Sequence, residues 1–324
     1  MNTQEQWALN TFVTQDILGT GSYSQVDLAK SKITGKLYAI KCVHKLHLIR
    51  NKKVKYASIE RDSMQKLLKA FLKSNSTSSN ISYFGCVILF ATLQDKDSLY
   101  YIMEYLPNGD LLRYIQEDST NAQNESSIAY IGAQLIDVIR FIQSHGIIHR
   151  DIKPENILFT DKWTVKLSDF GSAKILTPLD DKHDEHDDDR NETYNLLTRS
   201  NSFVGTAEYV TPELLASGYT DYRCDYWAAA CIFYQMKFGI PPFKDKTEYL
   251  TFKKITDCDI NEILSNSPNN ISSQLTDLVK GVLNKDIGQR LSLHDIITHQ
   301  FFKNHNIDFT KPETVWSPRP DLFR

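Results

Sequence analysis

The sequence predicts an α+β fold of two lobes, in which a small strand-rich lobe precedes a larger and mostly helical one. Three observations support this prediction. Residues 12–43 and 87–103 are rich in β-branched and aromatic residues, bounded by glycine and polar turn signals. From residue 128 onward, apolar residues recur at helical spacing. A chain of 324 residues is also longer than one small compact domain needs, so we expect the lobes to meet near residue 105.

The expected strands lie in the first third of the chain, and most of the expected helices follow them. The predicted strands cover residues 12–13, 17–18, 26–29, 37–40, 87–93 and 99–103. A helix is expected over residues 54–72, and the small polar residues 75–80 indicate a loop after it. The predicted helices of the second lobe cover residues 128–145, 224–238, 248–255, 273–283 and 293–299.

The composition is that of an ordinary globular protein and argues against several functional classes. With 41% hydrophobic residues, 24% charged residues and a net charge of -3, it gives no sign of a nucleic-acid partner. The five cysteines are scattered without a C-x-x-C pair, which is typical of a reducing compartment. We find neither a signal peptide nor an apolar run of membrane-spanning length. These features predict a cytoplasmic protein, with the nucleus as a second location.

Residues 180–192 are strongly acidic, with Lys182 and Arg190 as their bases. Such a run favours a solvated, disordered insertion. A metal site formed by His183 and His186 among the carboxylates is the alternative, although this spacing is common by chance.

Two glycines, Gly19 and Gly21, lie in a turn between predicted strands. Glycines in such a turn let the backbone lie close over phosphate groups, but a G-x-G is also an ordinary hairpin turn. Ser24 occupies the third position of the usual G-x-G-x-x-G and is small enough for the same approach. Val26 follows as an apolar residue that can cover a base.

A lysine, Lys41, lies inside the apolar strand Ala39-Ile40-Lys41. A buried lysine is costly unless it is paired, and an edge-strand lysine facing water is the simpler alternative. Glu60 lies in the helix that follows, so we expect a Lys41–Glu60 ion pair that holds the lysine against phosphates.

The most specific stretch is His149-Arg150-Asp151-Ile152-Lys153-Pro154-Glu155-Asn156. Asp151 is suited to accept the proton of a substrate hydroxyl, and Lys153 can neutralise charge on a phosphoryl group. Asn156 offers an oxygen ligand for Mg²⁺. A match of this length to H-R-D-x-K-P-x-N is very unusual by coincidence.

A second acidic motif, Asp169-Phe170-Gly171, follows at a suitable distance. Its carboxylate can bridge phosphates through Mg²⁺. Further along, Glu213 in Thr211-Pro212-Glu213 is expected to pair with Arg290, and Asp225 is expected to be a buried anchor for the Asp151 loop. We interpret both as structural rather than catalytic.

In this order and spacing the motifs resemble the eukaryotic protein kinase superfamily over residues 12–303. The resemblance implies a bilobal protein kinase fold. Its N-lobe, residues 12–104, would hold a small antiparallel sheet and one helix (αC in this family), and its C-lobe, residues 105–303, would be mostly helical. Residues 1–11 and 304–324 would be extensions on either side.

The same resemblance implies ATP and Mg²⁺ as cofactors and assigns the roles of the site residues. Asp151 and Lys153 would be catalytic, Asn156 and Asp169 would bind the metal, and Met103 would be the gatekeeper beside the adenine. The ATP-binding residues that it implies are Leu18, Gly19, Gly21, Ser24, Val26, Ala39, Lys41, Glu60, Glu104, Leu106, Asp110, Glu155, Asn156, Leu158 and Asp169.

Within the superfamily, the chain resembles the 3-phosphoinositide-dependent kinases of the AGC group of serine/threonine kinases. Residues 201–210 (NSFVGTAEYV) and 44–56 carry this resemblance. It implies that Ser202 is an activating phosphosite whose phosphate would contact Arg150, Lys174 and Tyr56. An unmodified loop serine is the alternative.

The resemblance also implies a docking groove on the N-lobe for the phosphorylated hydrophobic motif of protein substrates, which would be other AGC kinases. Such kinases carry a lipid-binding domain that we do not expect in this chain. Core packing is the alternative role for most of the groove residues. The implied set is Lys45, Leu48, Ile49, Ala57, Arg61, Thr92, Gln94 and Leu99, of which Lys45 and Arg61 would hold the phosphate.

Two other functions remain open at this stage. One is a pseudokinase scaffold, although Lys41, Asp151, Asn156 and Asp169 are all present. The other is a different AGC-type kinase. A P-loop nucleotidase is disfavoured because the chain has no G-x-x-x-x-G-K-[ST] motif.

Overall fold

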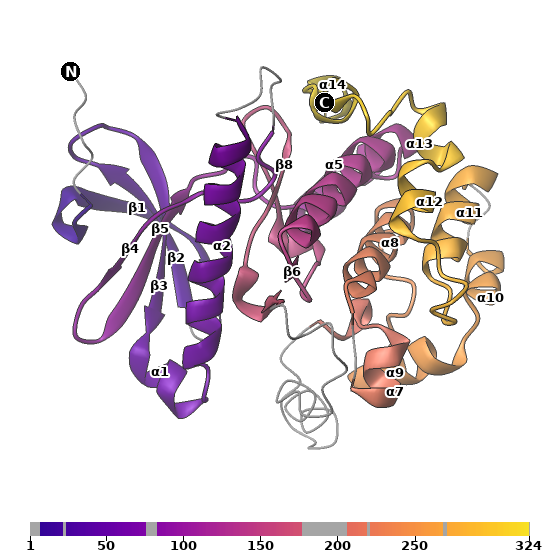
Figure 1. The fold of residues 1–324 in the computed structure, drawn as a ribbon, viewed down its shortest axis with the longest axis horizontal. Coiled ribbons are helices and arrows are strands. Elements are labelled where there is room, and N and C mark those ends of the chain that lie inside the picture. The colour runs from indigo at the N-terminus through magenta and orange to yellow at the C-terminus, as the bar shows by residue number, and fades with distance from the viewer. Residues whose placement is uncertain are drawn as a thin grey trace.

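The computed structural model describes residues 7–21, 24–75, 83–176, 206–218, 221–267 and 271–323. They form two lobes, a sheet-containing N-lobe drawn in indigo and a helical C-lobe drawn in magenta to yellow (Figure 1). The predicted α+β class is therefore confirmed.

A five-stranded antiparallel sheet with the order β1-β2-β3-β5-β4 forms most of the N-lobe. Its register places Lys41 opposite Tyr101 and Ala39 opposite Met103. Lys41 in β3 and Glu104 at the end of β5 both contact residues of the C-lobe, Asp169 and Lys166 respectively. The strands are β1 (Phe12–Thr20), β2 (Ser24–Ser31), β3 (Leu37–His44), β4 (Leu89–Gln94) and β5 (Ser98–Glu104).

The strand that we predicted from residue 87 begins two residues later than expected. The backbone N–H of Val87 donates to the carbonyl of Leu167 in the C-lobe, 2.9 Å away, and Cys86 forms a bridge with the same residue. Because these groups are paired across the lobes, they are not available to β5.

Two helices accompany the sheet. The long helix α2 (Val54–Asn75) corresponds to the predicted one, and it buries Met64 and Leu67. The short helix α1 (Lys45–Arg50) was not predicted. Its six residues are too few for helical periodicity to be recognised, and Leu48 is its one buried residue.

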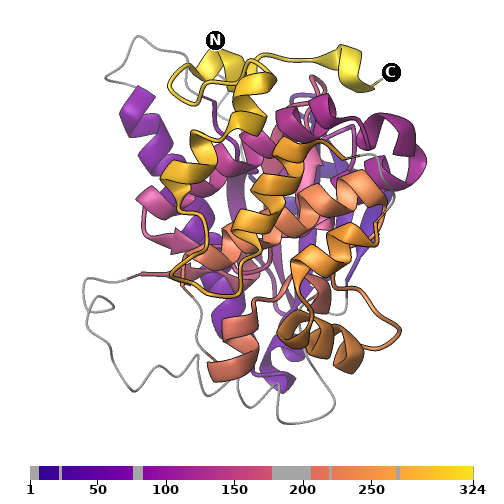
Figure 2. The same cartoon turned by 90° about the vertical axis from the view of Figure 1, so that its right-hand side faces the viewer.

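The C-lobe is organised around α5 and α8, which are buried along most of their length and pack against one another. Figure 2 shows the later helices in orange and yellow around this core. No helix among the described residues is both long and apolar enough to cross a membrane. The helices are α3 (Leu111–Glu117), α4 (Ser119–Ala122), α5 (Glu125–Ser144), α7 (Pro212–Ser217), α8 (Arg223–Phe238), α9 (Glu248–Asp257), α10 (Ile260–Ser265), α11 (Ser273–Val282), α12 (Leu293–Ile297), α13 (Gln300–Asn304) and α14 (Pro312–Trp316).

Short strands and single-turn helices support the loops between the lobes. Strand β6 pairs with β9, and β7 pairs with β8, both antiparallel. These pairs are too short to show an alternating sequence pattern, so they were not predicted. Their bounds are β6 (Ile147–Ile148), η2 (Pro154–Asn156), β7 (Ile157–Phe159), β8 (Val165–Leu167), η3 (Phe170–Ser172) and β9 (Lys174–Ile175), and the other single-turn helices are η1 (Leu9–Thr11), η4 (Ala207–Tyr209) and η5 (Pro320–Phe323).

The last residues pack onto the C-lobe rather than extending away from it. Val315, Trp316 and Leu322 are all buried. The resemblance implied that residues 304–324 are an extension outside the C-lobe. Their burial shows that residues 312–322 belong to the packed structure of the lobe.

Candidate active site

The loop that holds Asp151 is fixed by a buried carboxylate. Asp225, at 1% exposure, accepts hydrogen bonds from the backbone N–H groups of His149 and Arg150, both at 2.9 Å. Arg150 has a positive φ of 66°, a conformation that costs energy outside glycine. The two hydrogen bonds that Asp225 accepts stabilise this strained turn. Asp225 is therefore the buried anchor that we predicted for the Asp151 loop.

Three predicted residues of this loop lie together. The Lys153 Nζ is 2.9 Å from the Asp151 Oδ2. The Asn156 amide nitrogen donates to the Asp151 carbonyl at 2.8 Å and lies 3.3 Å from its Oδ2. Because the amide nitrogen is used in these bonds, the Asn156 Oδ1 is the atom left to face a cation.

Lys41 forms the predicted ion pair with Glu60, with 2.7 Å between Nζ and Oε1. Its Nζ is also 3.4 Å from the Asp169 Oδ1. Burial lowers the pKa of Lys41, but the carboxylates of Glu60 and Asp169 outweigh burial and hold that pKa above its ordinary value. The lysine is therefore charged, and it joins β3, α2 and the Asp169 motif.

Asp169 is held in a left-handed conformation, with φ of 58°, by a 3.3 Å bond from the Gly171 N–H to its Oδ1. The Lys41 ammonium lowers the pKa of this carboxyl below its usual value and outweighs the opposing effect of its partial desolvation. The next residue, Phe170, is fully buried, and its ring centroid lies 4.8 Å from that of His149. The buried ring thus anchors an ionised carboxylate that is 45% exposed.

These residues fit a divalent cation that prefers oxygen. The available donors are the ionised carboxylate of Asp169 and the amide oxygen of Asn156, which are hard ligands. Two protein ligands are few for a closed site, but they suit Mg²⁺, which takes its remaining ligands from phosphates and water. No cluster of three or more His, Cys, Asp or Glu is found among the described residues.

The other residues predicted to bind ATP come from both lobes, from β1–β3 and the segment after β5 on one side and from η2 and β7 on the other. Ala39 and Leu106 are buried, whereas Leu18 is 45% exposed. Asp110 caps α3 by accepting from the Arg113 N–H at 2.8 Å, a structural task that the sequence did not indicate. The remaining predicted positions are Gly19 in β1, Gly21 just after it, Ser24 and Val26 in β2, Glu155 in η2 and Leu158 in β7.

An ion pair that we did not predict connects the end of β5 to β8. The Lys166 Nζ lies 3.0 Å from the Glu104 Oε2, and Lys166 is only 9% exposed. Lys166 occupies the apolar sequence Val165-Lys166-Leu167, the same signal that drew attention to Lys41. The pattern was therefore sufficient to find a buried lysine, although not its partner.

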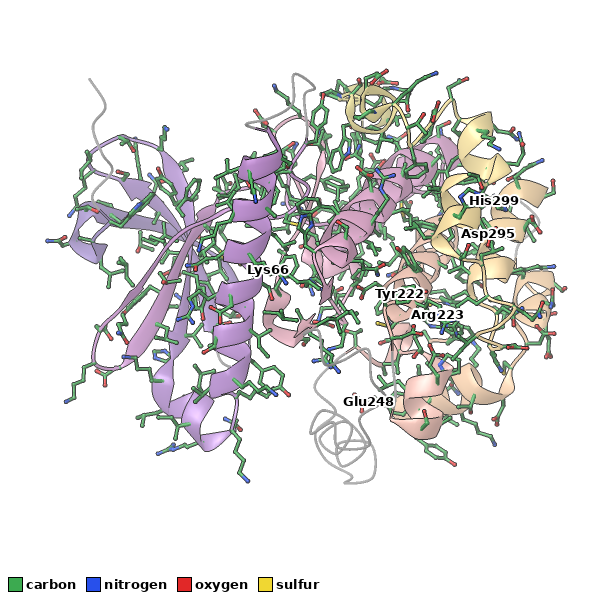
Figure 3. All side chains as sticks on the ribbon, in the orientation of Figure 1. Lys66, Tyr222, Arg223, Glu248, Asp295 and His299 are labelled. Carbon is green, nitrogen blue, oxygen red and sulfur yellow. The ribbon has the colours of Figure 1, made fainter. Side chains whose placement is uncertain are left out.

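A buried pair of the C-lobe was predicted correctly. The Arg290 guanidinium binds Glu213 through two bonds of 2.8 and 2.9 Å and lies over the Trp227 ring. Arg223, labelled at the start of α8 in Figure 3, donates to the carbonyl of Ile287 at 3.1 Å. These arginines tie the segment before Arg290 to α7 and α8.

The predicted docking-groove residues lie around α1, α2 and β4. The Lys45 Nζ donates to the Gln94 Oε1 at 3.0 Å, and Arg61 pairs with its neighbour Asp62 at 2.8 Å. Ile49 is 62% exposed, whereas Leu48 is buried in the core. Ile49 is therefore an exposed apolar residue of α1, while Leu48 serves packing. Ala57 is buried, Leu99 is half-buried, and Thr92 and Gln94 are exposed.

Two sequence predictions lie outside the described residues. These are the phosphosite Ser202 and the acidic segment 180–192 with its histidines. The proposed phosphate contact Arg150 is described, and its Nε donates to the Ser172 carbonyl at 2.8 Å.

The sequence of this chain matches one family model and several known proteins. The family model described as the protein kinase domain matches residues 12–302. The chain is 45% identical over 304 residues to the serine/threonine-protein kinase PKH2 of Saccharomyces cerevisiae, covering 94% of this chain and 25% of that protein. It is 38% identical to the serine/threonine-protein kinase ksg1 of Schizosaccharomyces pombe, over 95% of this chain and 48% of the relative.

A similar relation holds with an animal protein. The chain is 36% identical to the 3-phosphoinositide-dependent protein kinase 1 of Rattus norvegicus, over 89% of this chain and 45% of the relative. This chain therefore spans from a quarter to about half of the length of these relatives. The match over residues 12–302 and the shared motifs show that the chain belongs to the protein kinase family.

Proposed function

We propose that this chain transfers the γ-phosphate of ATP to serine and threonine hydroxyls of other AGC kinases, at sites in their activation loops. The observation that carries the transfer reaction is the cluster in which Lys41 contacts both Glu60 and Asp169. Asp151 and Lys153 form the neighbouring pair. The choice of AGC kinases as substrates rests on similarity to PKH2, ksg1 and the rat enzyme.

The residues of the site have separate roles in an in-line transfer. ATP, when bound, would supply the phosphoryl group, and Mg²⁺ held by Asn156 and Asp169 would offset the charge of the phosphates. Asp151 orients the substrate hydroxyl and accepts its proton, while Lys153, 2.9 Å from that carboxylate, stabilises the charge on the transferred group. Lys41, held by Glu60, positions the phosphates. Most of the rate then comes from positioning and electrostatics.

The proposal is tested by ³²P transfer from ATP to peptides that copy the activation loops of AGC kinases. Purified parent protein should phosphorylate them, and the Asp169→Asn variant should not, with folding verified by circular dichroism. A parent protein that binds nucleotide but transfers no phosphate under these conditions would instead be a pseudokinase scaffold. Preference for unrelated serine/threonine peptides would indicate a different AGC-type kinase.

The partner proposal concerns the groove that contains Ile49, Lys45 and Arg61. Ile49 is an exposed apolar side chain on α1, Lys45 lies on the same helix and Arg61 lies on α2. Such a combination of an apolar side chain and cations suits a phosphorylated hydrophobic peptide. Such a peptide should bind and stimulate the parent, and Arg61→Ala should weaken binding of the phosphorylated form more than that of the unphosphorylated one. Equal binding of both forms would argue against a phosphate contact at Arg61.

Regulation by Ser202 is proposed from the resemblance of residues 201–210. Mass spectrometry of the purified protein, with and without ATP, should show phosphate on Ser202, and Ser202→Ala should lower activity. An active Ser202→Ala variant with parental rates would remove this idea.

A cytoplasmic and partly nuclear location is proposed on the sequence features alone, and imaging of a fluorescent fusion tests it.

A further inference from the structure

The hairpin of β7 and β8 carries the two proposed metal ligands at its open end. Asn156 directly precedes β7, and Asp169 follows β8 after Ser168. The backbone N–H and the hydroxyl of Ser168 both donate to the Asn156 carbonyl, at 2.9 and 3.0 Å. The two ligands are therefore tied to one small unit, and whatever orients that unit also orients them.

Residues 312–323 contact this hairpin at its turn. The ring of Phe323 stacks on that of Trp163 with centroids 4.5 Å apart and planes at 15°, and it meets Phe159 edge-on at 5.6 Å. The Tyr114 hydroxyl donates to the carbonyl of Leu322 at 3.1 Å, which fixes the preceding residue. Trp163 has a positive φ of 60°, so an aromatic cover supports a strained turn.

Residues 312–323 also reach the end of the hairpin near Asp169. They do so through the segment around Gly85, which precedes β4. Trp316 is 3% exposed, its Nε1 donates to the Asp137 Oδ2 at 2.8 Å, and its ring stacks on Tyr83 at 5.6 Å. A Cβ on Gly85 would lie 2.8 Å from the Trp316 ring, so the ring is in close contact with this backbone. The Gly85 carbonyl in turn accepts from the Leu167 N–H at 2.8 Å, two residues before Asp169.

We propose that residues 312–323 are a positioning element for the divalent cation, because Trp316 and Phe323 hold the β7–β8 hairpin at its two ends. The inference rests on the proposed function, since the cation is the one that accompanies the nucleotide. Trp316 and Phe323 are positioning residues, which act through Leu167 and the hairpin turn without contacting the metal. Groups that hydrogen-bond to metal ligands commonly change metal affinity by about 10–100-fold. Trp316 and Phe323 act at one further remove, so we expect an effect at the lower end of this range.

Simple coverage of apolar surface is the competing explanation, and it predicts a different result. Removing Trp316 or Phe323 would then lower stability and leave metal affinity unchanged. Phe309 provides a matched control within the same C-terminal stretch. Its ring is 6% exposed and packs on Phe302 at 5.2 Å, and no ring contact joins it to the hairpin among the described residues.

The experiment is calorimetric titration of the full chain with ADP, once with Mg²⁺ and once with EDTA. We expect Trp316→Ala and Phe323→Ala to reduce the Mg²⁺-dependent gain in ADP affinity by about tenfold. ADP affinity in EDTA should stay at the parental value. Trp316→Phe, which keeps a stacking ring, should retain most of the gain. Phe309→Ala should lower the melting temperature without changing the gain.

Milder variants keep the inference testable if the alanine variants do not fold. Phe323→Leu and Trp316→Leu should then show faster amide hydrogen exchange at Phe159 and Leu167, respectively, together with a smaller Mg²⁺-dependent gain. An unchanged gain in the alanine and leucine variants of Trp316 and Phe323, with stability losses like that of Phe309→Ala, would overturn the inference. A parent that binds ADP with Mg²⁺ but transfers no phosphate would contradict the proposed function alone.

Discussion

At the scale of single residues, the site is a set of charges that compensate one another. Lys41 lies between Glu60 at 2.7 Å and Asp169 at 3.4 Å. A buried ammonium without a partner would be costly, so each carboxylate stabilises the charged lysine. The pair between Asp151 and Lys153 repeats this arrangement beside the position proposed for the substrate hydroxyl.

A first prediction concerns the coupling of Lys41 and Glu60. Glu60→Gln and Lys41→Met should each lower kcat/KM by about 10²–10³-fold, because each removes a contact that positions phosphate charge. The double variant should lose little more than the larger single effect, since both substitutions disable one unit. Steady-state kinetics of the four proteins measure this coupling, and fully multiplicative effects would contradict it.

A second prediction follows from the pKa of Asp169, which Lys41 lowers. A carboxyl with a lowered pKa in the folded state contributes stability above its unfolded pKa of about 3.9 and loses it as pH falls further. The difference in unfolding free energy between the parent and Asp169→Asn should therefore be constant from about pH 5 to 7 and change only below about pH 4. Urea unfolding in EDTA across this range is the measurement, and a change centred near pH 6 would be inconsistent with a lowered pKa.

At the scale of elements, buried polar groups fix how helices and loops meet. Asp225 at the start of α8 holds the backbone of the Asp151 loop, and Arg290 holds α7 through Glu213. Thr211 caps α7 by accepting from the Leu214 N–H, a role that suits a threonine at the start of a helix. These contacts join segments that are distant in sequence.

A third prediction uses the contrast between two arginines. The Arg290 side chain has no exposure and that of Glu213 has 9%, so Arg290→Ala would leave a buried carboxylate unpaired. We expect this change to cost about 3–5 kcal/mol of unfolding free energy. Arg113→Ala breaks an exposed pair with Glu117, with 63% and 62% exposure, and should cost about 0–1 kcal/mol. Chemical denaturation of both variants measures the difference, and equal costs would count against the role given to burial.

At the scale of the whole molecule, the two lobes share one hydrophobic core. Val43, Met64 and Tyr101 from the N-lobe belong to the same buried cluster as α5 and α8 of the C-lobe. The hydrogen bond from Val87 to Leu167 and the ion pair from Glu104 to Lys166 also cross between them. Binding in the site between the lobes should therefore stabilise both.

A fourth prediction is that ADP with Mg²⁺ raises the melting temperature of the molecule as a unit. Ligand at about 100 times its Kd should stabilise the folded state by about 2.7 kcal/mol. Scanning calorimetry should show a single transition that shifts with ligand, and EDTA should reverse the metal-dependent part of the shift. A ligand-sensitive transition beside an unshifted one would show instead that the lobes unfold separately.

The motifs that carry chemistry were recognisable from the sequence because each is a short local pattern. Asp151, Lys153, Asn156 and Asp169 lie in such patterns, and the partners of Lys41 and Arg290 were found from the spacing of these motifs. The long helices α2, α5 and α8 were predicted for the same reason, since many residues repeat one period.

Other contacts between distant residues became known only from the tertiary structure. Lys166 and its partner Glu104 were not predicted, because their contact depends on how β5 approaches β8. The packing of Trp316 and Phe323 against the hairpin of the proposed metal ligands has no local signature. The sequence by itself thus determined the chemistry and the class of fold, since these depend on residue type and periodicity. The orientation of the catalytic groups depends on long-range packing, which no local pattern encodes.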